Sequence, residues 1–332
     1  MITFNPYGWV LHVRHWLYDT GRLPSVAFDF PVLCVGNVTV GGTGKTPLVA
    51  FLVQSFLNQG YCPVVLSRGY GRKTKGFRYV AEADTATMSG DEPVQLKRTF
   101  PHVTVAVCED RVAGIRRLVR NAEVSSGKAP DVVLLDDAFQ YRRLRATCSI
   151  LLEDFARPIA QDRLLPFGRL RDLPQAARRA HCLVVTKCPP VYAQTTPETH
   201  RLLTAEGQSI PVFFAFIEYE PLPLPEGAAI LLVTGIARPE PLEAHLKAHY
   251  NVRMHLRFPD HHAFSAGDTA RLAALRAANP TWHLVTTEKD AVRLPFPDAL
   301  PVRIRTSAPA NAQQTLTQFL NETALCDLTG RR

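Results

Sequence analysis

The stretch that decides the fold spans residues 32–46 and reads Val32-Leu33-Cys34-Val35-Gly36-Asn37-Val38-Thr39-Val40-Gly41-Gly42-Thr43-Gly44-Lys45-Thr46. Its apolar start is too short for a helix and is bounded by Pro31 and Gly36, which predicts a buried parallel strand. A helix is predicted over residues 46–58, with Gly60 just past its end. Between the strand and the helix lies a glycine-rich loop.

That loop has the features of a phosphate-binding loop. Small residues let successive backbone N–H groups point at phosphate oxygens, a lysine reaches the β- and γ-phosphates, and a hydroxyl binds Mg²⁺. The glycine that opens the usual pattern G-x-x-x-x-G-K-[ST] is replaced by Thr39. The flanking strand and helix favour nucleoside triphosphate binding over a glycine-rich turn with an incidental lysine. We assign to this site Thr39, Val40, Gly41, Gly42, Thr43, Gly44, Lys45 and Thr46.

Outward from the loop, short apolar runs alternate with helical stretches. Further strands are predicted at 63–66, 103–107, 131–137, 149–152 and 181–186. This alternation predicts a mostly parallel sheet with helices on both faces. A proline-rich stretch at 219–227 is the best linker candidate, and a smaller α/β unit is predicted beyond it. We therefore divide the chain into segments 1–22, 23–218 and 219–332.

Composition limits the class of protein. The chain has 332 residues, of which 46% are hydrophobic and 20% charged, so it fits about two ordinary globular domains. Its net charge of +8 suits an anionic partner such as nucleic acid, a phosphorylated substrate or a membrane surface. No recognised nucleic-acid-binding module supports the first of these, so we expect no nucleic acid partner.

Cysteine usage and hydropathy bear on the compartment. The seven cysteines are scattered and form no Cys-x-x-Cys pair, which indicates a reducing compartment without disulfides or a zinc site. No run of 18 apolar residues is present, so we expect no transmembrane span. His12, Arg14 and His15 interrupt the N-terminal apolar region, which argues against a signal peptide.

The first 22 residues form a distinct segment rich in aromatic side chains. Trp9, Val13, Trp16 and Leu17 recur at helical spacing and share one face, with basic residues nearby. Such a helix suits a membrane interface, where aromatic side chains lie at headgroup depth. The alternative is a terminal helix that docks on the protein's own core, and the residues alone leave both open.

Carboxylates are placed where a phosphate loop needs a metal ligand. Asp136 and Asp137 close a predicted strand, and two adjacent carboxylates there are costly unless a cation or hydrogen bonds neutralise them. We favour a Mg²⁺ site over a helix N-cap. At 89–93, Ser89 and Glu92 have capping-box spacing, so this segment is read first as a helix start, with Asp91 as a candidate general base.

Two other motifs are less decisive. His261 and His262 follow Pro259-Asp260 in the second unit, where paired histidines bind metal, titrate or hydrogen-bond in a loop. The segment Thr186-Lys187-Cys188-Pro189 is similar to the [NT]-K-x-D motif of GTPases, but proline stands where the guanine-reading aspartate belongs. This departure weakens a GTPase interpretation.

Taken together, these motifs resemble one family, tetraacyldisaccharide 4′-kinase, the lipid A disaccharide kinase of Gram-negative bacteria. The matching segments lie at 16–19, 35–47, 67–72, 90–93, 135–140, 164–171, 258–262 and 286–291. The family carries a hydroxyl residue where Thr39 stands. It commonly has Gly, His and Glu where this chain has Ala138, Tyr141 and Asp172, which leaves open any role of the family histidine.

The resemblance implies a P-loop NTPase-like three-layer α/β/α domain joined to a smaller α/β domain, with the active site in the cleft between them. It implies transfer of the γ-phosphoryl group of ATP to the 4′-hydroxyl of tetraacyldisaccharide 1-phosphate. Lys45 would stabilise phosphate charge, and Thr46, Asp136 and Asp137 would organise Mg²⁺. Asp91 would act as base, assisted by His261 from the second domain; choosing His261 over His262 rests on motif position.

The resemblance also implies where the enzyme works. The N-terminal helix becomes a monotopic anchor on the cytoplasmic face of the bacterial inner membrane, facing anionic lipid. We expect the substrate to contact Arg68, Tyr70, Arg72, Gln140 and Arg171. No obligate protein partner is evident. The alternatives are a soluble P-loop kinase for a small metabolite and a nucleotide-switched binding protein.

Overall fold

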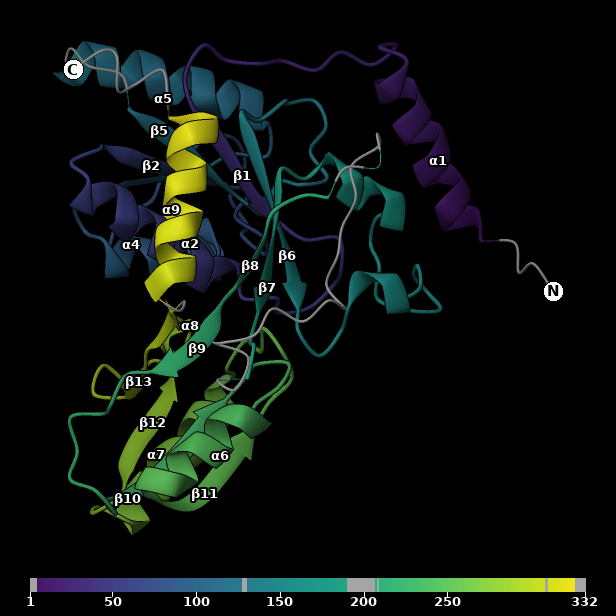
Figure 1. Ribbon diagram of the computed structural model, residues 1–332. Helices are drawn as coiled ribbons and strands as arrows, with labels where there is room; N and C mark the ends of the chain where they lie inside the picture. The colour runs from purple at the N-terminus through teal and green to yellow at the C-terminus, as the bar shows by residue number, and fades with distance from the viewer. Residues whose placement is uncertain (1–4, 127–129, 190–206, 208, 308–309, 326–332) are drawn as a thin grey trace.

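A computed structural model describes residues 5–126, 130–189, 207, 209–307 and 310–325 of the chain (Figure 1). Its larger unit is built on a sheet of eight strands in the order β3-β4-β2-β5-β1-β6-β7-β8. These strands are β1 (Val32–Gly36), β2 (Pro63–Ser67), β3 (Arg78–Tyr79), β4 (Thr104–Val107), β5 (Val132–Asp136), β6 (Cys148–Asp154), β7 (Cys182–Thr186) and β8 (Val212–Phe214). All neighbouring pairs are parallel except β3 with β4.

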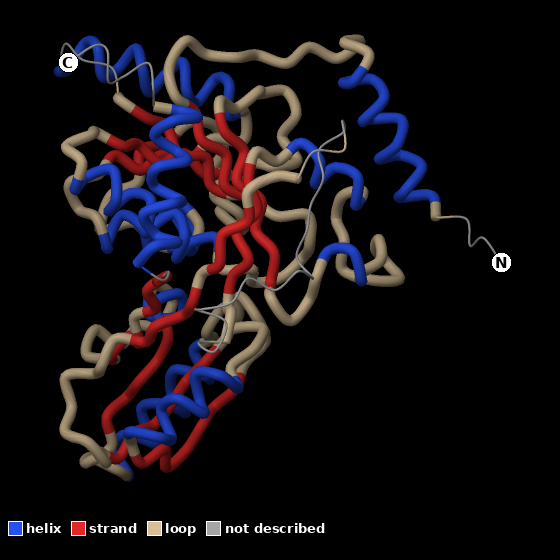
Figure 2. Tube along the Cα trace, viewed as in Figure 1, coloured by secondary structure: helices blue, strands red, loops and turns tan. Residues whose placement is uncertain are grey.

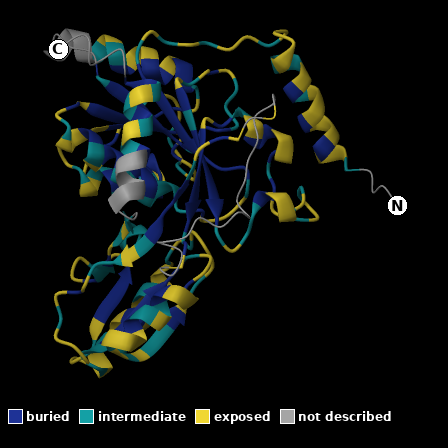
Figure 3. Cartoon of the chain, viewed as in Figure 1, coloured by how far each residue is buried: buried dark blue, intermediate teal, exposed yellow. Residues whose placement is uncertain are grey.

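Helices cover both faces of this sheet, as the alternating pattern predicted. The helices of this unit are α2 (Lys45–Asn58), α3 (Ala86–Ser89), α4 (Asp91–Thr99), α5 (Arg111–Ser126) and α9 (Ala310–Ala324). One core cluster joins the sheet to α2, α4 and α9, and the other joins it to α5. Two short 3₁₀ helices, Ile159–Gln161 and Pro174–Arg179, extend the second cluster. The central strands β1, β2, β5, β6 and β7 are almost completely buried (Figure 3).

Strand order explains the position of the site. From β1 the chain crosses to β2 on one side, whereas β5 leads to β6 on the other side of β1. The strand order thus reverses beside β1, and ligands of open α/β sheets bind at such a switch point, outside the carboxyl ends of the strands. At that edge the glycine-rich loop follows β1, Asp136 ends β5, and Asp137 comes directly after it.

The smaller unit is a second parallel sheet with a helix on each face. Its strand order is β11-β10-β12-β13, from β10 (Ala229–Thr234), β11 (Asn251–Arg257), β12 (His283–Thr287) and β13 (Leu300–Val302). Helix α6 (Glu240–His249) packs on one face through Leu242 and Leu246. Helix α7 (Ala266–Ala278) packs on the other, and its predicted capping box between Ser265 and Asp268 is present. A short helix, α8 (Glu288–Ala291), follows β12.

The chain passes between the units twice. A two-stranded antiparallel ribbon pairs β9 (Phe216–Tyr219) with β14 (Ile304–Ser307), and the two sheets are separate in Figure 2. Beyond β14 the chain returns to the larger unit, where Leu316, Leu320 and Leu325 join its core. We propose that the second structural unit lies between the two ribbon strands, so that α9, although within segment 219–332, belongs physically to the first unit.

The N-terminal helix α1 (Pro6–Asp19) lies at the periphery (Figure 1). Asn5 caps it by accepting a hydrogen bond from the Gly8 N–H. Leu11 and His15 are buried, whereas Trp9, Val13 and Trp16 are exposed by 63%, 37% and 48%. The aromatic face therefore points to solvent and does not dock on the core. Within the described residues, no helix is long and apolar enough to cross a bilayer.

Candidate functional site

Hydrogen bonds from the side chains of Asn37 and Thr186 support the phosphate loop. Gly44 precedes α2 with φ 79°, a left-handed conformation that glycine adopts without strain, and so lets the helix start at Lys45. The Asn37 amide donates to the hydroxyls of Thr43 (2.8 Å) and Thr39 (3.2 Å). Thr186, from β7, donates to the Thr43 carbonyl (2.8 Å). These hydrogen bonds within the protein fix the shape of the loop.

Lys45 and Arg171 converge on Asp137. The Lys45 Nζ lies 3.8 Å from Asp137 Oδ1, and Arg171 binds both oxygens of that carboxylate. Asp137 has φ 52°, an uncommon conformation that turns its side chain out of the end of β5. Burial favours its neutral form, but Lys45, Arg171 and Arg111 outweigh this and hold the pKa of Asp137 below its usual value. Asp137 is therefore ionised beside the phosphate loop.

Asp136 is the opposite case. It is buried, and burial together with the charges of Glu92 and Asp137 raises the pKa of Asp136 to about 7. Its Oδ2 is 3.5 Å from the Ser67 hydroxyl, while its buried Oδ1 has no partner. An unsatisfied buried carboxylate oxygen fits a cation or a cation-bound water.

Residue types and positions here fit Mg²⁺. In the described part of the chain, no three His, Cys, Asp or Glu side chains form a ready-made metal cluster. Mg²⁺ is usually held by one or two carboxylates, a loop hydroxyl and substrate phosphates rather than an all-protein cage. Asp136, Asp137 and Thr46 supply that set, with Lys45 adjoining.

Glu92 lies near the candidate site, which the sequence did not predict. The predicted capping box is wrong, because α4 begins at Asp91 after Gly90 and has no side-chain cap. The Ser89 hydroxyl instead donates to Asp84 (2.5 Å). Glu92 is thus free of the capping role, and its charge acts on Asp136. A second acidic residue directly after Asp91 was the available signal.

The structure brings Asp91 and His261 together across the junction of the two units. His261 Nδ1 lies 2.9 Å from Asp91 Oδ2, and Arg293 Nε lies 3.4 Å from the same oxygen. Burial alone would raise the pKa of Asp91, but the hydrogen bond from His261 and the charge of Arg293 outweigh it and lower that pKa. His262 points elsewhere and bonds Asp268 at 3.0 Å.

Gly90 allows Asp91 to reach this position. Gly90 has φ 91°, and a side chain there would meet the Tyr70 carbonyl at 3.0 Å. The loop 67–72 therefore packs against the start of α4. From this loop the exposed ring of Tyr70 contacts His261 edge-on, with centroids 5.9 Å apart.

The residues expected to contact substrate are placed differently from one another. Arg68 is exposed. The side chain of Arg72 is 2% exposed, and its guanidinium binds Glu109 (2.5 Å) and the Gly76 carbonyl (2.7 Å). Gln140 and Arg171 lie under the phosphate loop, where both donate to Asn37. Arg68 and Tyr70 are thus the two of the five that face outward on the loop 67–72.

Arg111 is a second residue of this region that was not predicted from the sequence, and no sequence signal marks it. It is 5% exposed, and burial and the charge of Arg68 lower its pKa. Its guanidinium lies 4.7 Å from the centre of the Tyr141 ring, whose hydroxyl is 2.8 Å from Asp110. Tyr141, which departs from the family pattern, therefore packs beside a buried cation rather than in the phosphate loop.

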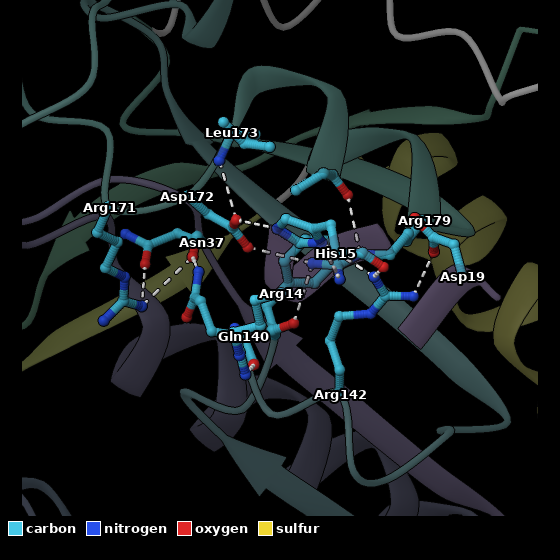
Figure 4. A network of polar contacts seen from close by, with 12 residues as sticks. Arg14, His15, Asp19, Asn37, Gln140, Arg142, Arg171, Asp172, Leu173 and Arg179 are labelled. Atoms are coloured by element: carbon cyan, nitrogen blue, oxygen red, sulfur yellow. Dashed lines mark hydrogen bonds and ion pairs between the residues drawn. The ribbon is translucent and has the colours of Figure 1, made fainter. Parts of the chain in front are cut away.

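A polar network joins α1 to the phosphate-loop region (Figure 4). His15 Nε2 lies 2.5 Å from Asp172, and Arg142 contacts the other ring nitrogen at 2.9 Å. Arg14 donates to the Gln140 carbonyl (2.7 Å). Since Asp172 adjoins Arg171, the inner side of α1 is anchored to the segments that hold Asn37 and Asp137. This anchoring leaves the outer, aromatic side free.

Comparisons with known proteins show the family of the chain. The profile of the LpxK family, tetraacyldisaccharide-1-P 4′-kinase, matches residues 5–323. A tetraacyldisaccharide 4′-kinase of Parabacteroides distasonis is 41% identical over 312 residues, which cover 89% of this chain and 84% of that protein. A relative of the same name from Bacteroides fragilis is 38% identical, covering 90% and 86%.

A solved structure is similar over nearly the full length. The crystal structure of LpxK from Aquifex aeolicus in complex with ATP superposes with a TM-score of 0.74 at 28% identity, and the match covers 96% of each chain. The α/β architecture is therefore shared over nearly the whole chain. The chain belongs to the tetraacyldisaccharide-1-P 4′-kinase family.

Proposed function

We infer that this protein is an ATP-dependent kinase that phosphorylates the 4′-hydroxyl of tetraacyldisaccharide 1-phosphate, a step of lipid A biosynthesis. Family membership supports the reaction class and the acceptor. The observation that carries the mechanism is the contact between Asp91 and His261. This pair can activate the acceptor hydroxyl, and it adjoins Glu92, whose charge acts on Asp136 at the end of β5.

The nucleotide is held by the loop 39–46. The start of α2 and the backbone N–H groups of the loop attract the phosphates, and Lys45 reaches the β- and γ-phosphates. As negative charge moves onto the leaving phosphate, the ammonium of Lys45 stabilises it. Arg171 holds the Asp137 carboxylate in place. Lys45 therefore stays available to the phosphates of ATP and does not form a closer ion pair with Asp137.

Mg²⁺ would be held by Thr46 and Asp137, with Asp136 directly or through water. The ion would neutralise phosphate charge and orient the γ-phosphoryl group. The unpartnered Oδ1 of Asp136 supports this role. A cation there would stabilise the charged form of the carboxylate, which burial disfavours.

Asp91 acts on the acceptor. It is ionised, so it can accept the proton of the 4′-hydroxyl while the hydroxyl oxygen attacks the γ-phosphorus. Both protein contacts to Asp91 described above use Oδ2, and Oδ1 takes part in neither. Because His261 belongs to the second unit, closure of the units completes the site and limits access of water to ATP.

The outer side of the protein suits a lipid acceptor. We propose that Trp9, Val10, Val13 and Trp16 of α1 enter the headgroup region on the cytoplasmic face of the inner membrane, with basic residues near anionic lipid. Arg68 and Tyr70 are our candidates for the substrate headgroup. Arg72 is not a candidate for this contact, because its guanidinium already binds Glu109 and the Gly76 carbonyl.

The test is incubation with Mg·ATP and tetraacyldisaccharide 1-phosphate, with mass analysis of the lipid. A lipid heavier by one phosphoryl group is expected from the wild-type protein. Turnover of a soluble sugar or nucleoside in its place would favour the small-metabolite kinase, and tight nucleotide binding without transfer would favour the switch.

A further inference from the structure

Lys289 stands at the start of α8, in the segment Thr286-Thr287-Glu288-Lys289-Asp290, and the reaction described above gives it no task. Its Nζ lies 3.0 Å from His261 Nε2, on the side of the ring that faces away from Asp91. The same Nζ lies 3.0 Å from Asp260 Oδ1. The imidazole is thus held between a carboxylate at one nitrogen and an ammonium at the other.

These two partners agree on one arrangement of protons. A lysine ammonium has three donors and no acceptor, so His261 Nε2 must offer its lone pair. An ionised carboxylate only accepts, so Nδ1 must carry the hydrogen that faces Asp91. In a neutral histidine, the hydrogen bond at one ring nitrogen determines the protonation of the other. Lys289 and Asp91 therefore select the same tautomer.

The backbone around Lys289 is fixed. The buried carboxylate of Asp290 accepts from the Gly235 N–H (2.8 Å), and the Gly235 carbonyl accepts from the His261 N–H (3.2 Å). Thr287 caps α8. His261 itself has φ 58°, a strained conformation for a non-glycine residue that persists only where the surroundings enforce it. Lysine and imidazole are therefore presented to each other by two segments that are both hydrogen-bonded to Gly235.

We propose that Lys289 is a positioning residue that holds His261 as the Nδ1–H tautomer and thereby reserves proton abstraction for Asp91. In this tautomer neither ring nitrogen is free to take the hydroxyl proton, since Nδ1 already carries one and Nε2 is occupied. The proton passes to Asp91 Oδ1 as the acceptor oxygen bonds to the γ-phosphorus and the bond to ADP breaks. The proposal rests on the proposed kinase function.

The ring nitrogens of His261 report this directly. In protein labelled with ¹⁵N-histidine, and with the signals assigned by comparison with His261→Gln, we expect the wild type to show a protonated Nδ1 and an unprotonated Nε2. Lys289→Met keeps most of the side-chain length but removes the donor. We expect Nε2 to become protonated in a substantial fraction of that variant, and Lys289→Arg to restore the wild-type pattern.

Steady-state kinetics of the same variants provide a second test of the role of Lys289. Acid–base catalysis contributes about 10²–10⁴-fold in rate, so loss of the correct tautomer should lower kcat about tenfold or more. KM for ATP and for lipid should change little. Lys289→Arg should recover most of kcat, and Lys247→Met, at an exposed lysine of α6, should match the wild type. Thermal unfolding of each variant verifies that it is folded.

The outcomes distinguish the role of Lys289 from the proposed kinase function. An unchanged ¹⁵N pattern in Lys289→Met overturns the role of Lys289, whatever the activity, and so does an altered pattern with unchanged kcat. A rise in KM for lipid at constant kcat would make Lys289 a substrate contact and also overturn it. The NMR arm needs no turnover, so absence of lipid phosphorylation by the wild type overturns the proposed function instead.

Discussion

The two halves of the candidate site are built in different ways. The phosphate-loop half, with Lys45, Asp137 and Arg171, lies within the larger unit and is tied together by hydrogen bonds through Asn37. The acceptor half joins Asp91 of the larger unit to His261 of the smaller one. The contacts of the first half lie within one unit, whereas the contact of the second half depends on how the two units meet.

We propose that the two units have distinct tasks in the reaction. A rigid cradle suits ATP, because electrostatic stabilisation works best with groups that need not reorganise. A pair divided between units suits the acceptor, because activation of a hydroxyl before the site closes would favour water. Substitutions in the first half should therefore affect every reaction of ATP, and substitutions in the second should affect transfer to lipid.

The largest effect is expected at Lys45. Lys45→Met removes the charge that faces the transferring phosphoryl group, so kcat should fall about 10²–10³-fold. Steady-state rates of ADP release and of lipid product measure this, and both should fall together. Lys247→Met serves as control. A variant that keeps more than a tenth of the wild-type rate would contradict this role.

Asp91→Asn should come next, with loss of about 10²-fold or more in kcat for lipid and little change in ATP affinity. Residues that act as a unit are not additive. His261→Gln should therefore add little to the loss when combined with Asp91→Asn. Full additivity of the two losses in a double-mutant cycle would show that the contact at 2.9 Å is not used as a pair.

A smaller effect is expected at α1. Replacing Trp9 and Trp16 together by glutamate should weaken sedimentation with vesicles that contain anionic lipid about tenfold or more. The rate with short-chain, monomeric acceptor should be unchanged. Leu57→Glu is a matched control, since Leu57 is an exposed apolar residue on α2. Equal vesicle binding by wild type and double variant would remove α1 from the membrane interface.

The smallest effect concerns pH and the anchoring of α1. Burial would raise the pKa of Asp172, but the hydrogen bond from His15 and the charge of Arg179 outweigh it and lower that pKa in the folded protein. This contribution to stability is present above the unfolded pKa of about 4 and is lost as the pH falls through the lower folded value.

Asp172→Asn should therefore cost about 2 kcal/mol of unfolding free energy at pH 7 and less at acid pH. Urea denaturation at several pH values measures the difference. A cost that is equal at pH 7 and pH 3 would assign the effect to packing and not to ionisation.

The sequence was informative where chemistry is local. A strand followed by glycines, lysine and threonine has one common structural meaning, and paired aspartates at a strand end follow from it. The family resemblance added the expectation that Asp91 works with a histidine from the second unit. Elements bounded by glycine or proline, such as β1 and α2, were predicted to within a residue or two.

The contacts that could not be predicted join residues that are far apart in the sequence. Arg72 lies in a basic run that suggests a phosphate contact, yet its guanidinium binds Glu109, 37 positions away. Glu92 was read as a cap because the capping pattern is local, whereas its interaction with Asp136 is not. Arg111 and Lys289 are ordinary basic residues until the fold sets them beside Tyr141 and His261.

The most direct test of a divided site measures how tightly ATP consumption is coupled to the acceptor. ADP and phosphorylated lipid are quantified together, with and without tetraacyldisaccharide 1-phosphate, at equal Mg·ATP. We predict one ADP per lipid product, and ADP release at least about 10²-fold slower without acceptor. Equal ADP release in both conditions would contradict the claim that the acceptor half directs the phosphoryl group to lipid rather than to water.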